Sequence, residues 1–394
     1  MLQTLDELIA RGVRGQRVFV RADLNVPTKD GRVGDDTRIR ATLPTLQKLL
    51  SAGARVVLAS HLGRPKGKVD AKYSLAPVAK RLGELLGKPV GFVAACIGPD
   101  AEAAVAKLRD GEVLLLENLR FHAEEEQNEP GFAASLAKHA EIYVNDAFGT
   151  AHRAHASTAG MVPHAKRVAA GDLLRAELDH LRHVLDPARP FLCLLGGAKV
   201  SDKLAVLEAM ARRADVICIG GAMAYTFLRA QGLPVGSSLV EAERIEDAQR
   251  ILAAAKDSGH KLLLPLDHVV AQKLEAGAEA KVVRTIPDGW MGLDIGPETA
   301  KAYAAEAARA KTIFWNGPMG VFEIDAFAKG TEAVALAVAD SKAASVVGGG
   351  DSLAAVNKLG LAERITHCST GGGASLEFVE GRTLPGVAAL ESAA

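Results

Sequence analysis

Two glycines and two lysines in residues 196–203, GGAKVSDK, are the first feature of this chain that could do chemistry. They follow the apolar run 190–196 and precede a helix-like stretch. Glycines let backbone amides approach an anion, and a helix N-terminus complements negative charge. The segment therefore indicates a phosphate site, although its spacing differs from the common P-loop, G-x-x-x-x-G-K-[ST].

Further glycine-rich segments follow other strand candidates of the second half, at 220–228, 315–323, 347–352 and 369–375. Each alone could be a tight turn, but several on one side of one domain favour a nucleotide. Lys199 and Lys203 would add positive charge, and Asp351 could hold Mg²⁺ together with phosphate oxygens. Asn316 and Glu323 could hydrogen-bond the ribose or the base.

The strand candidates of the first half are followed by basic and polar residues instead. These residues are Arg21, Asp23, Asn25, Arg38, Arg40, His61, Arg64, Arg120, His152, Arg153 and His155. A single arginine of this kind is usually part of a surface salt bridge. Because several share the same position at strand ends, they predict a site for a small polyanion, which guanidinium groups bind bidentately.

Short apolar runs alternate with helical stretches along the whole chain, which predicts parallel sheets built from right-handed β-α-β units. The predicted strands are 17–24, 54–60, 112–118, 141–148, 190–196, 215–220, 261–267, 312–318 and 344–350. Residues 171–185 read as one amphipathic helix between the two strand sets. In an open parallel sheet, ligands bind outside the carboxyl ends of the strands, where the candidate residues lie.

Composition excludes several classes of protein. Lys+Arg and Asp+Glu are both 47, so a general affinity for nucleic acid or for an acidic membrane is not expected. The four cysteines form no C-x-x-C pair, which fits free thiols in a reducing cytosol. Neither a signal peptide nor a membrane-spanning stretch is recognisable, so we expect a cytoplasmic protein.

Common motifs of other nucleotide-dependent enzymes are missing. There is no G-x-G-x-x-G with an acidic residue about 20 positions on, so a dinucleotide is the weaker choice. No H-R-D or D-F-G set of a protein kinase appears either. An NAD-linked dehydrogenase and a metabolite sensor without catalysis remain as alternatives, the sensor being expected to lose Arg38 or Lys199.

Nine segments, in this order, resemble the phosphoglycerate kinase family from end to end. They are RADLNVP, DDTRIRA, SHLGRP, LLLENLRF, NDAFGTAHRAHAS, GGAKVSDK, IFWNGPMGVFE, VGGGDS and STGGGASLE. The resemblance implies reversible phosphoryl transfer from 1,3-bisphosphoglycerate to MgADP, giving 3-phosphoglycerate and MgATP, by a monomeric enzyme. Departures are small: Ala22 and Leu24 replace the usual Val and Phe, and Ser352 replaces the more frequent Thr.

The resemblance also implies which residues act. The substrate-binding set is Asp23, Asn25, Arg38, His61, Arg64, Arg120 and Arg153. The nucleotide-binding set is Lys199, Lys203, Gly220, Asn316, Glu323, Gly349, Gly350, Asp351 and Ser352, with Asp351 on Mg²⁺. The catalytic set is Arg38, Lys199, Gly350 and Gly373.

The expected fold is α/β, with two doubly wound, Rossmann-like parallel-sheet domains joined by a helical hinge. Residues 1–170 would form the glycerate-binding domain, to which about 377–394 return, as the family resemblance implies. Residues 171–185 would form the interdomain helix, and 186–376 the nucleotide-binding domain. We expect in-line transfer after domain closure, with hinges near 149–157, in 171–185 and near 370–373.

Overall fold

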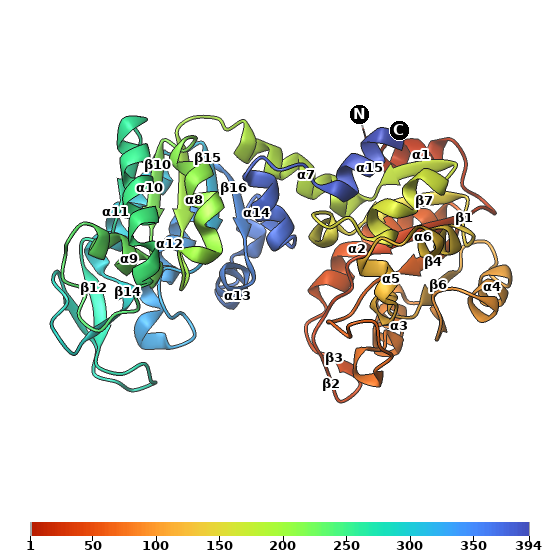
Figure 1. Ribbon diagram of the computed structural model, residues 1–394, viewed down its shortest axis with the longest axis horizontal. Coiled ribbons are helices and arrows are strands. Elements are labelled where there is room, and N and C mark those ends of the chain that lie inside the picture. The colour runs from red at the N-terminus through yellow and green to blue at the C-terminus, as the bar shows by residue number, and fades with distance from the viewer. Residues whose placement is uncertain (1, 394) are drawn as a thin grey trace. The chain divides into compact units, whose positions relative to one another are not determined.

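The computed structural model describes residues 2–393 (Figure 1). Among these residues the chain forms two six-stranded parallel sheets, which confirms the predicted α/β class. It divides into two compact units. The first unit comprises the described residues of Met1–Leu178 and Thr383–Ala394, and the second unit is Asp179–Arg382.

The sheet of the first unit has the strand order β5-β6-β4-β1-β7-β8, with every neighbouring pair parallel. Its strands are β1 (Arg17–Ala22), β4 (Arg55–Ala59), β5 (Gly91–Val93), β6 (Val113–Leu116), β7 (Ile142–Asp146) and β8 (Arg167–Ala170). The four strands predicted in this half are β1, β4, β6 and β7. The edge strands β5 and β8 were not predicted, because three or four residues carry too little of a strand pattern.

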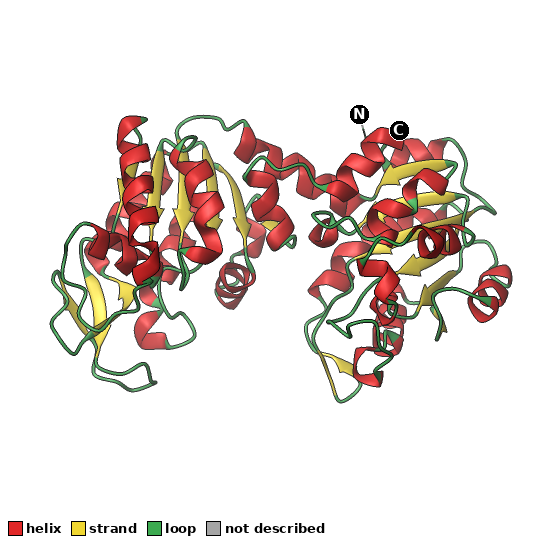
Figure 2. Ribbon diagram, viewed as in Figure 1, coloured by secondary structure: helices red, strands yellow, loops and turns green. Residues whose placement is uncertain are grey.

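Helices cover both faces of this sheet (Figure 2). They are α1 (Leu5–Ala10), α2 (Thr37–Ser51), α3 (Ala76–Leu86), α4 (Pro99–Ala106), α5 (Ala123–Glu126), α6 (Pro130–Ala137) and α15 (Pro385–Ala393). Shorter turns are η1 (Ala71–Tyr73), η2 (Leu119–Phe121), η3 (Phe148–Thr150), η4 (Ala156–Gly160) and η5 (Val162–His164), and β2 (Thr28–Lys29) pairs with β3 (Arg32–Val33) as a small hairpin. The last helix, α15, contacts η4, η5 and β8 of this unit.

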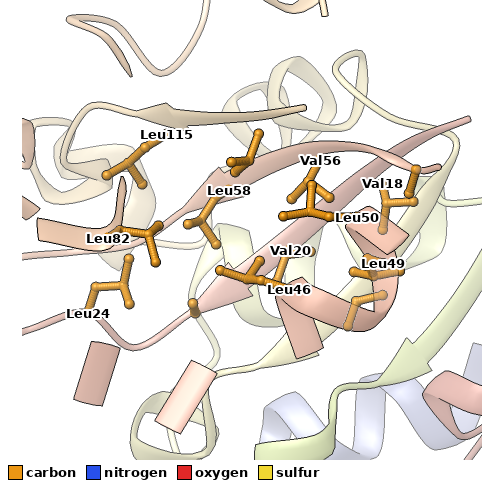
Figure 3. Close-up of a cluster of buried hydrophobic side chains, with 14 of the residues drawn as sticks. Val18, Val20, Leu24, Leu46, Leu49, Leu50, Val56, Leu58, Leu82 and Leu115 are labelled. Atoms are coloured by element: carbon orange, nitrogen blue, oxygen red, sulfur yellow. The ribbon is translucent and has the colours of Figure 1, made fainter. Parts of the chain in front are cut away.

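One face of the first sheet buries a continuous apolar cluster under α2 and α3 (Figure 3). Alternate residues of β1, Val18 and Val20, point to this face because side chains along a strand alternate. From α2, Leu46, Leu49 and Leu50 recur at helical spacing and pack against them. Each fully buried side chain of this kind contributes about 1.5–3 kcal/mol relative to exposure. The packing fixes β1, which Asp23 directly follows, and α2, which carries Arg38.

The sheet of the second unit has the order β11-β10-β9-β15-β16-β17, again parallel throughout. Its strands are β9 (Phe191–Leu195), β10 (Val216–Ile219), β11 (Lys261–Leu263), β15 (Thr312–Asn316), β16 (Ala344–Gly348) and β17 (His367–Ser369). The five strands predicted here are β9, β10, β11, β15 and β16. The short edge strand β17 and an antiparallel sheet of β12 (His268–Ala271), β13 (Lys281–Val283) and β14 (Met291–Ile295) were not predicted.

Helices also lie on both faces of the second sheet (Figure 2). They are α8 (Leu204–Ala211), α9 (Met223–Ala230), α10 (Ile245–Asp257), α11 (Pro297–Arg309), α12 (Lys329–Asp340), α13 (Gly350–Lys358) and α14 (Gly373–Val379), with η6 (Ser201–Lys203), η7 (Ala242–Arg244), η8 (Asp325–Phe327) and η9 (Ala362–Arg364). Trp315 of β15 is completely buried under α11 and α12, and its indole N–H donates to the Gly317 carbonyl at 2.8 Å. This bond fixes the turn that leaves β15.

The helix expected at 171–185 is α7 (Asp172–Leu185). Its first half belongs to the first unit and its second half to the second, because the division falls between Leu178 and Asp179. Within residues 2–393 no helix combines the length and the apolar character that crossing a membrane requires.

Candidate active site

The candidate residues of the first unit follow neighbouring strands at the carboxyl edge of the sheet. Asp23 comes directly after β1, His61 after β4, and Arg120 lies in η2 after β6. Arg153 follows β7 through η3. Because β6, β4, β1 and β7 are adjacent in the sheet, their carboxyl ends open on one edge, as predicted.

Arg38, near the start of α2, is held by the loop that leaves β1. Its Nη1 donates to both carboxylate oxygens of Asp23 at 3.1 Å and to the Asn25 carbonyl at 3.4 Å. The Asn25 side chain in turn accepts from the Gly63 amide at 2.8 Å. Asp23 is buried, whereas the Arg38 side chain keeps 33% of its surface exposed. Arg38 is therefore oriented by the protein and still accessible to a ligand.

His61 lies among positive charges. Burial lowers its pKa well below the usual value, and the charges of Arg21, Arg120 and Arg38 lower it further. The imidazole is therefore neutral at physiological pH, because its charged form would be both desolvated and repelled. Such a surplus of positive charge is relieved when an anion binds.

Of the arginines in the expected substrate-binding set, Arg120 is the most buried, with 5% of its side chain exposed. Burial lowers its pKa to about 10, and the neighbouring Arg21 and Arg153 act in the same direction. Its Nη1 donates to the Gly63 carbonyl at 3.0 Å, and Glu126 lies 3.5 Å from its Nε. The carboxylates of Glu126 and Glu125 oppose this shift without cancelling it.

The remaining predicted residues of this unit differ in accessibility. Arg64 is exposed, and Arg153 is half-buried with its Nε bonded to Nε2 of His152 at 3.3 Å. His155 is buried, and desolvation followed by the charge of Arg120 lowers its pKa to about 3. The structure thus brings His61, Arg38, Arg120 and Arg153 into one electrostatic cluster.

Arg21 has a structural role that sequence reasoning did not give it. It is fully buried, and its Nε donates to Ser157 Oγ at 2.8 Å while its Nη2 lies 3.2 Å from Nδ1 of His61. Ser157 also donates to Glu125, from Oγ at 2.5 Å and from its amide at 2.9 Å. This chain of contacts fixes the His61 ring through its Nδ1 atom.

Glu125 was missed because it stands in the run EEEQ, which reads as an exposed helical face. It is completely buried, and desolvation raises its pKa despite the nearby charge of Arg21. Its partner Ser157 is distant in the sequence and lies in η4. Ser157 belongs to the HAS segment noted in the sequence, but nothing in that segment indicates a contact with Glu125. No local sequence pattern would therefore have identified this pair.

In the second unit, Lys203 lies under the glycine-rich loops. Its Nζ donates to the carbonyls of Gly196 and Asn316, each at 2.7 Å. Burial lowers its pKa to about 8, although the charges of Asp351 and Asp202 oppose the shift. Lys203 therefore sits beside two of the predicted loops, with its ammonium group held at their base.

The loops that follow β9, β10 and β15 are tied together by backbone hydrogen bonds. The Gly196 amide donates to the Asn316 carbonyl at 3.1 Å, and the Gly197 amide to the Pro318 carbonyl at 3.0 Å. A Cβ atom added to Gly196 would lie 2.0 Å from the Pro318 oxygen. These glycines are required for loop-to-loop packing, a use that the sequence interpretation did not foresee.

Gly220 shows the same effect, since it is buried and an added Cβ would lie 2.4 Å from Met319 Sδ. Gly350 differs, because no atom lies within 4 Å of its added Cβ. Gly350 and Gly373 are exposed and begin α13 and α14. The predicted glycines thus fall into a packed group and an open group.

Two polar side chains connect β15 to the start of α13. Ser352 Oγ accepts from the Gly317 amide at 2.6 Å. The Nδ2 of Asn316 is buried and, within the part of the chain that the structure describes, has no hydrogen-bond partner. It lies close to Gly349, whose φ of 91° turns the chain into α13. A buried donor without a partner suits a ligand oxygen.

Apart from Lys203, the charged residues predicted for the nucleotide are exposed. These are Lys199, Glu323 and Asp351. Among residues 2–393, no group of three or more His, Cys, Asp or Glu side chains could hold a metal ion by itself. A single carboxylate such as Asp351 suits Mg²⁺ only where phosphate oxygens complete the coordination, which is the usual situation for a Mg-nucleotide.

Two α/β units, one with a cationic edge and the other with a lysine under glycine-rich loops, are typical of a phosphotransferase for small molecules. The family model described as phosphoglycerate kinase matches residues 8–382. The phosphoglycerate kinase of Moorella thermoacetica is 58% identical over 381 residues, covering 96% of this chain and 97% of the relative.

Solved structures agree. A phosphoglycerate kinase structure from Coxiella burnetii is 41% identical with a TM-score of 0.90, and one from Pyrococcus horikoshii OT3 is 36% identical with a TM-score of 0.87. Each match covers 100% of this chain and 99% of the other. The chain belongs to the phosphoglycerate kinase family. It is an enzyme with phosphoglycerate kinase activity in glycolysis and gluconeogenesis, and its substrates include a nucleotide.

Proposed function

We propose that the cationic edge of the first unit binds the phosphoglycerate and that the glycine-rich edge of the second unit binds ADP or ATP with Mg²⁺. The observation that carries this assignment is the environment of His61, because Arg21, Arg38 and Arg120 all place positive charge near its imidazole. A substrate with a phosphate and a carboxylate would neutralise that charge.

In the glycerate site, Arg38, Arg64, Arg120 and Arg153 contact the phosphates and the carboxylate, and His61 adds a neutral hydrogen-bonding group. Asp23 and Asn25 line the same site. The support is that Asp23 and Asn25 already hold Arg38 in place.

In the nucleotide site, Lys203 contacts the phosphates, and Lys199 follows the phosphoryl group as it moves. The loop from Gly349 to Ser352 approaches the phosphates, with Gly350 and Gly373 admitting the transferred group. Gly220, Asn316 and Glu323 contact the base or the ribose. The support is the unpartnered Nδ2 of Asn316 and the open space at Gly350.

Asp351 would hold the Mg²⁺ that arrives with the nucleotide. This ion would supply positive charge for the phosphate oxygens. The exposed carboxylate at the start of α13 and the absence of a three-ligand site among residues 2–393 both suit a metal that the substrate carries in.

The chemical step is direct transfer between two oxygens in line with the phosphorus. Both acceptors, the glycerate carboxylate and the terminal ADP oxygen, are ionised already, so no general base is required. Charge spreads over three equatorial oxygens in the transition state, and Arg38 and Lys199 neutralise it. No covalent phospho-enzyme is involved.

Because the two substrates are assigned to different units, the units must bring them together before transfer. Closure would also keep water from the acyl phosphate. We assign the hinges to Gly149–Ser157, to α7 and to Thr370–Gly373. Small-angle scattering that shows no compaction with both substrates present would contradict this part of the proposal.

We also propose a monomer in the cytoplasm. The support for the compartment is that all four cysteines are free thiols, as a reducing environment favours. A sedimentation experiment that gives a mass well above 41.2 kDa would contradict the monomer.

The test is ATP consumption with 3-phosphoglycerate and Mg²⁺, coupled to glyceraldehyde-3-phosphate dehydrogenase and NADH. We expect turnover only when all three components are present, and a strong loss in Lys203→Ala. Turnover that persists without Mg²⁺, or that survives intact in Lys203→Ala, would overturn the assignment of the nucleotide site.

A further inference from the structure

The loop that carries Lys199 is anchored by an acidic residue from another element. Glu241 immediately precedes η7, and its carboxylate accepts hydrogen bonds from the amides of Val200 and Ser201. The Ser201 hydroxyl donates to the same carboxylate at 2.5 Å. These three bonds occupy the start of η6, directly beside Lys199.

The bonds from Glu241 replace a cap that the loop itself lacks. Val200 stands at the N-cap of η6 and supplies no side-chain hydrogen bond, and neither does Lys203 at the N-cap of α8. The first amides of a helical segment require an acceptor from elsewhere. A carboxylate is well suited because these amides carry partial positive charge.

Glu241 is ionised at neutral pH. Burial would raise its pKa, but the hydrogen bonds from Ser201 and Val200 and the charge of Lys199 outweigh this, so the pKa lies below its usual value. Glu241 is itself fixed, because its amide donates to Thr226 Oγ1 of α9 at 3.1 Å and Thr226 is buried. Helix α10 packs against both α8 and α9 (Figure 1).

Lys199 therefore lies between two anchors. On one side, the amides of Gly196 and Gly197 are bonded to the loop after β15. On the other side, Glu241 holds Val200 and Ser201. Only Ala198 and Lys199 remain between them, and both are exposed. The direction of the Lys199 backbone is thus decided by Glu241 as much as by β9.

We infer that Glu241 is a positioning residue for the transferred phosphoryl group, acting through Lys199. The inference rests on the proposed role of Lys199. The Glu241 carboxylate accepts hydrogen bonds from the amides at the start of η6, so these amides are not available to bind a phosphate. The phosphate therefore binds the Lys199 ammonium group instead. Glu241 thereby also selects which group of the loop the nucleotide meets.

The test compares Glu241→Ala with the matched control Glu243→Ala, an exposed acid two residues further on. We expect Glu241→Ala to lower kcat about 10- to 100-fold, because a small displacement of a group at the reacting centre has that effect. The equilibrium Kd for ADP should change less than kcat. Lys203 ends η6, but its ammonium group is also held by the carbonyls of Gly196 and Asn316, which do not contact Glu241. Glu243→Ala should resemble the parent enzyme.

Two further variants separate positioning from simple stabilisation. Glu241→Gln keeps an acceptor for the two amides and should recover part of kcat. In a Lys199→Ala background, Glu241→Ala should cause little additional loss, because the group through which it acts is already missing. If Glu241→Ala does not fold, Ser201→Ala weakens the same contact and should show the same dependence on Lys199.

The outcomes distinguish this inference from the proposed function. Normal turnover in Glu241→Ala, with Lys199→Ala strongly impaired, would overturn the role of Glu241 alone. If the factors by which the two substitutions lower kcat multiply in the double variant, Glu241 does not act through Lys199. This result would also overturn the inference and leave Glu241 as a residue that only stabilises the fold. Normal turnover in Lys199→Ala would instead refute the role proposed for Lys199, on which the inference rests.

Discussion

The guanidinium of Arg38 is bonded to both carboxylate oxygens of Asp23, although one residue follows a strand and the other lies in a helix. The carboxylate orients the guanidinium, and the open side of Arg38 remains available to a substrate. An arginine held in advance loses less conformational freedom when it meets the transition state.

We expect Arg38→Ala to lower kcat by about 100- to 1,000-fold, since it removes a charge that is assigned to the transferred group. The Kd for ADP, measured by calorimetry, should change little because the nucleotide is assigned to the other unit. Arg40→Ala is the control: Arg40 is exposed and pairs with Asp36 at 2.7 Å. Near-normal turnover in Arg38→Ala would remove this residue from the catalytic set.

Asp351→Ala should weaken the binding of MgADP far more than that of 3-phosphoglycerate, since the carboxylate is assigned to the metal. The affinity for ADP without Mg²⁺ should change less, because the carboxylate then has no ion to bind. Calorimetric titrations with and without Mg²⁺ provide the measurement. Equal weakening of both substrates would mean that Asp351 serves only to begin α13.

Lys203 predicts a pH dependence of nucleotide binding. Its pKa is lowered to about 8, so the ammonium is charged below that value and becomes neutral above it. The affinity for ADP should therefore fall as pH rises from about 7 to about 9.5. Bound phosphates favour the charged form, which moves the decline in the complex above 8.

Lys203→Arg is the control for this pH dependence, because the ordinary pKa of a guanidinium lies about two units or more above that of an ammonium group. Whatever the size of its affinity for ADP, that affinity should stay flat over the same pH range. A parent profile as flat as that of Lys203→Arg would show that Lys203 does not contact the nucleotide.

Gly350→Ala should fold normally, because the added Cβ meets no atom within 4 Å and φ is not in the left-handed region. Turnover should nevertheless fall, since that space is assigned to the transferred group. Thermal unfolding and the coupled assay separate the two effects. Full activity at an unchanged Tm would remove Gly350 from the catalytic set.

Asp146 predicts a pH dependence of stability. The amides of Leu173 and Leu174, at the start of α7, donate to its Oδ1 at 2.9 and 3.3 Å. Burial raises its pKa to about 7. The protonated form therefore contributes stability that is fully present below about pH 4 and is lost as pH rises through about 7.

Asp146→Asn keeps an acceptor for both amides and carries no charge. The parent should lose stability relative to Asp146→Asn between about pH 5 and about pH 8, as urea unfolding midpoints would show. Asp110→Asn, which changes an exposed acid paired with Arg55, should follow the parent at both pH values. An unchanged difference between parent and Asp146→Asn would mean that Asp146 does not titrate in this range.

The sequence by itself determined the α/β class, the central strands and most of the charged candidates. Apolar runs at 17–24 and 190–196 are local patterns, and Asp23 and the loop 196–203 stand beside them in the chain. Residues that directly follow a strand come to the carboxyl edge whatever the strand order is. The short strands β5, β8 and β17 were missed because a few residues carry too little pattern.

Only the tertiary structure decided which distant groups meet. Glu125 belongs to an acidic run that reads as exposed, yet it is buried against Ser157 and supports Arg21. Glu241 caps a loop that lies 40 residues earlier in the chain. Such pairs depend on the order of strands in a sheet and on the packing of helices between them, which local periodicity does not encode.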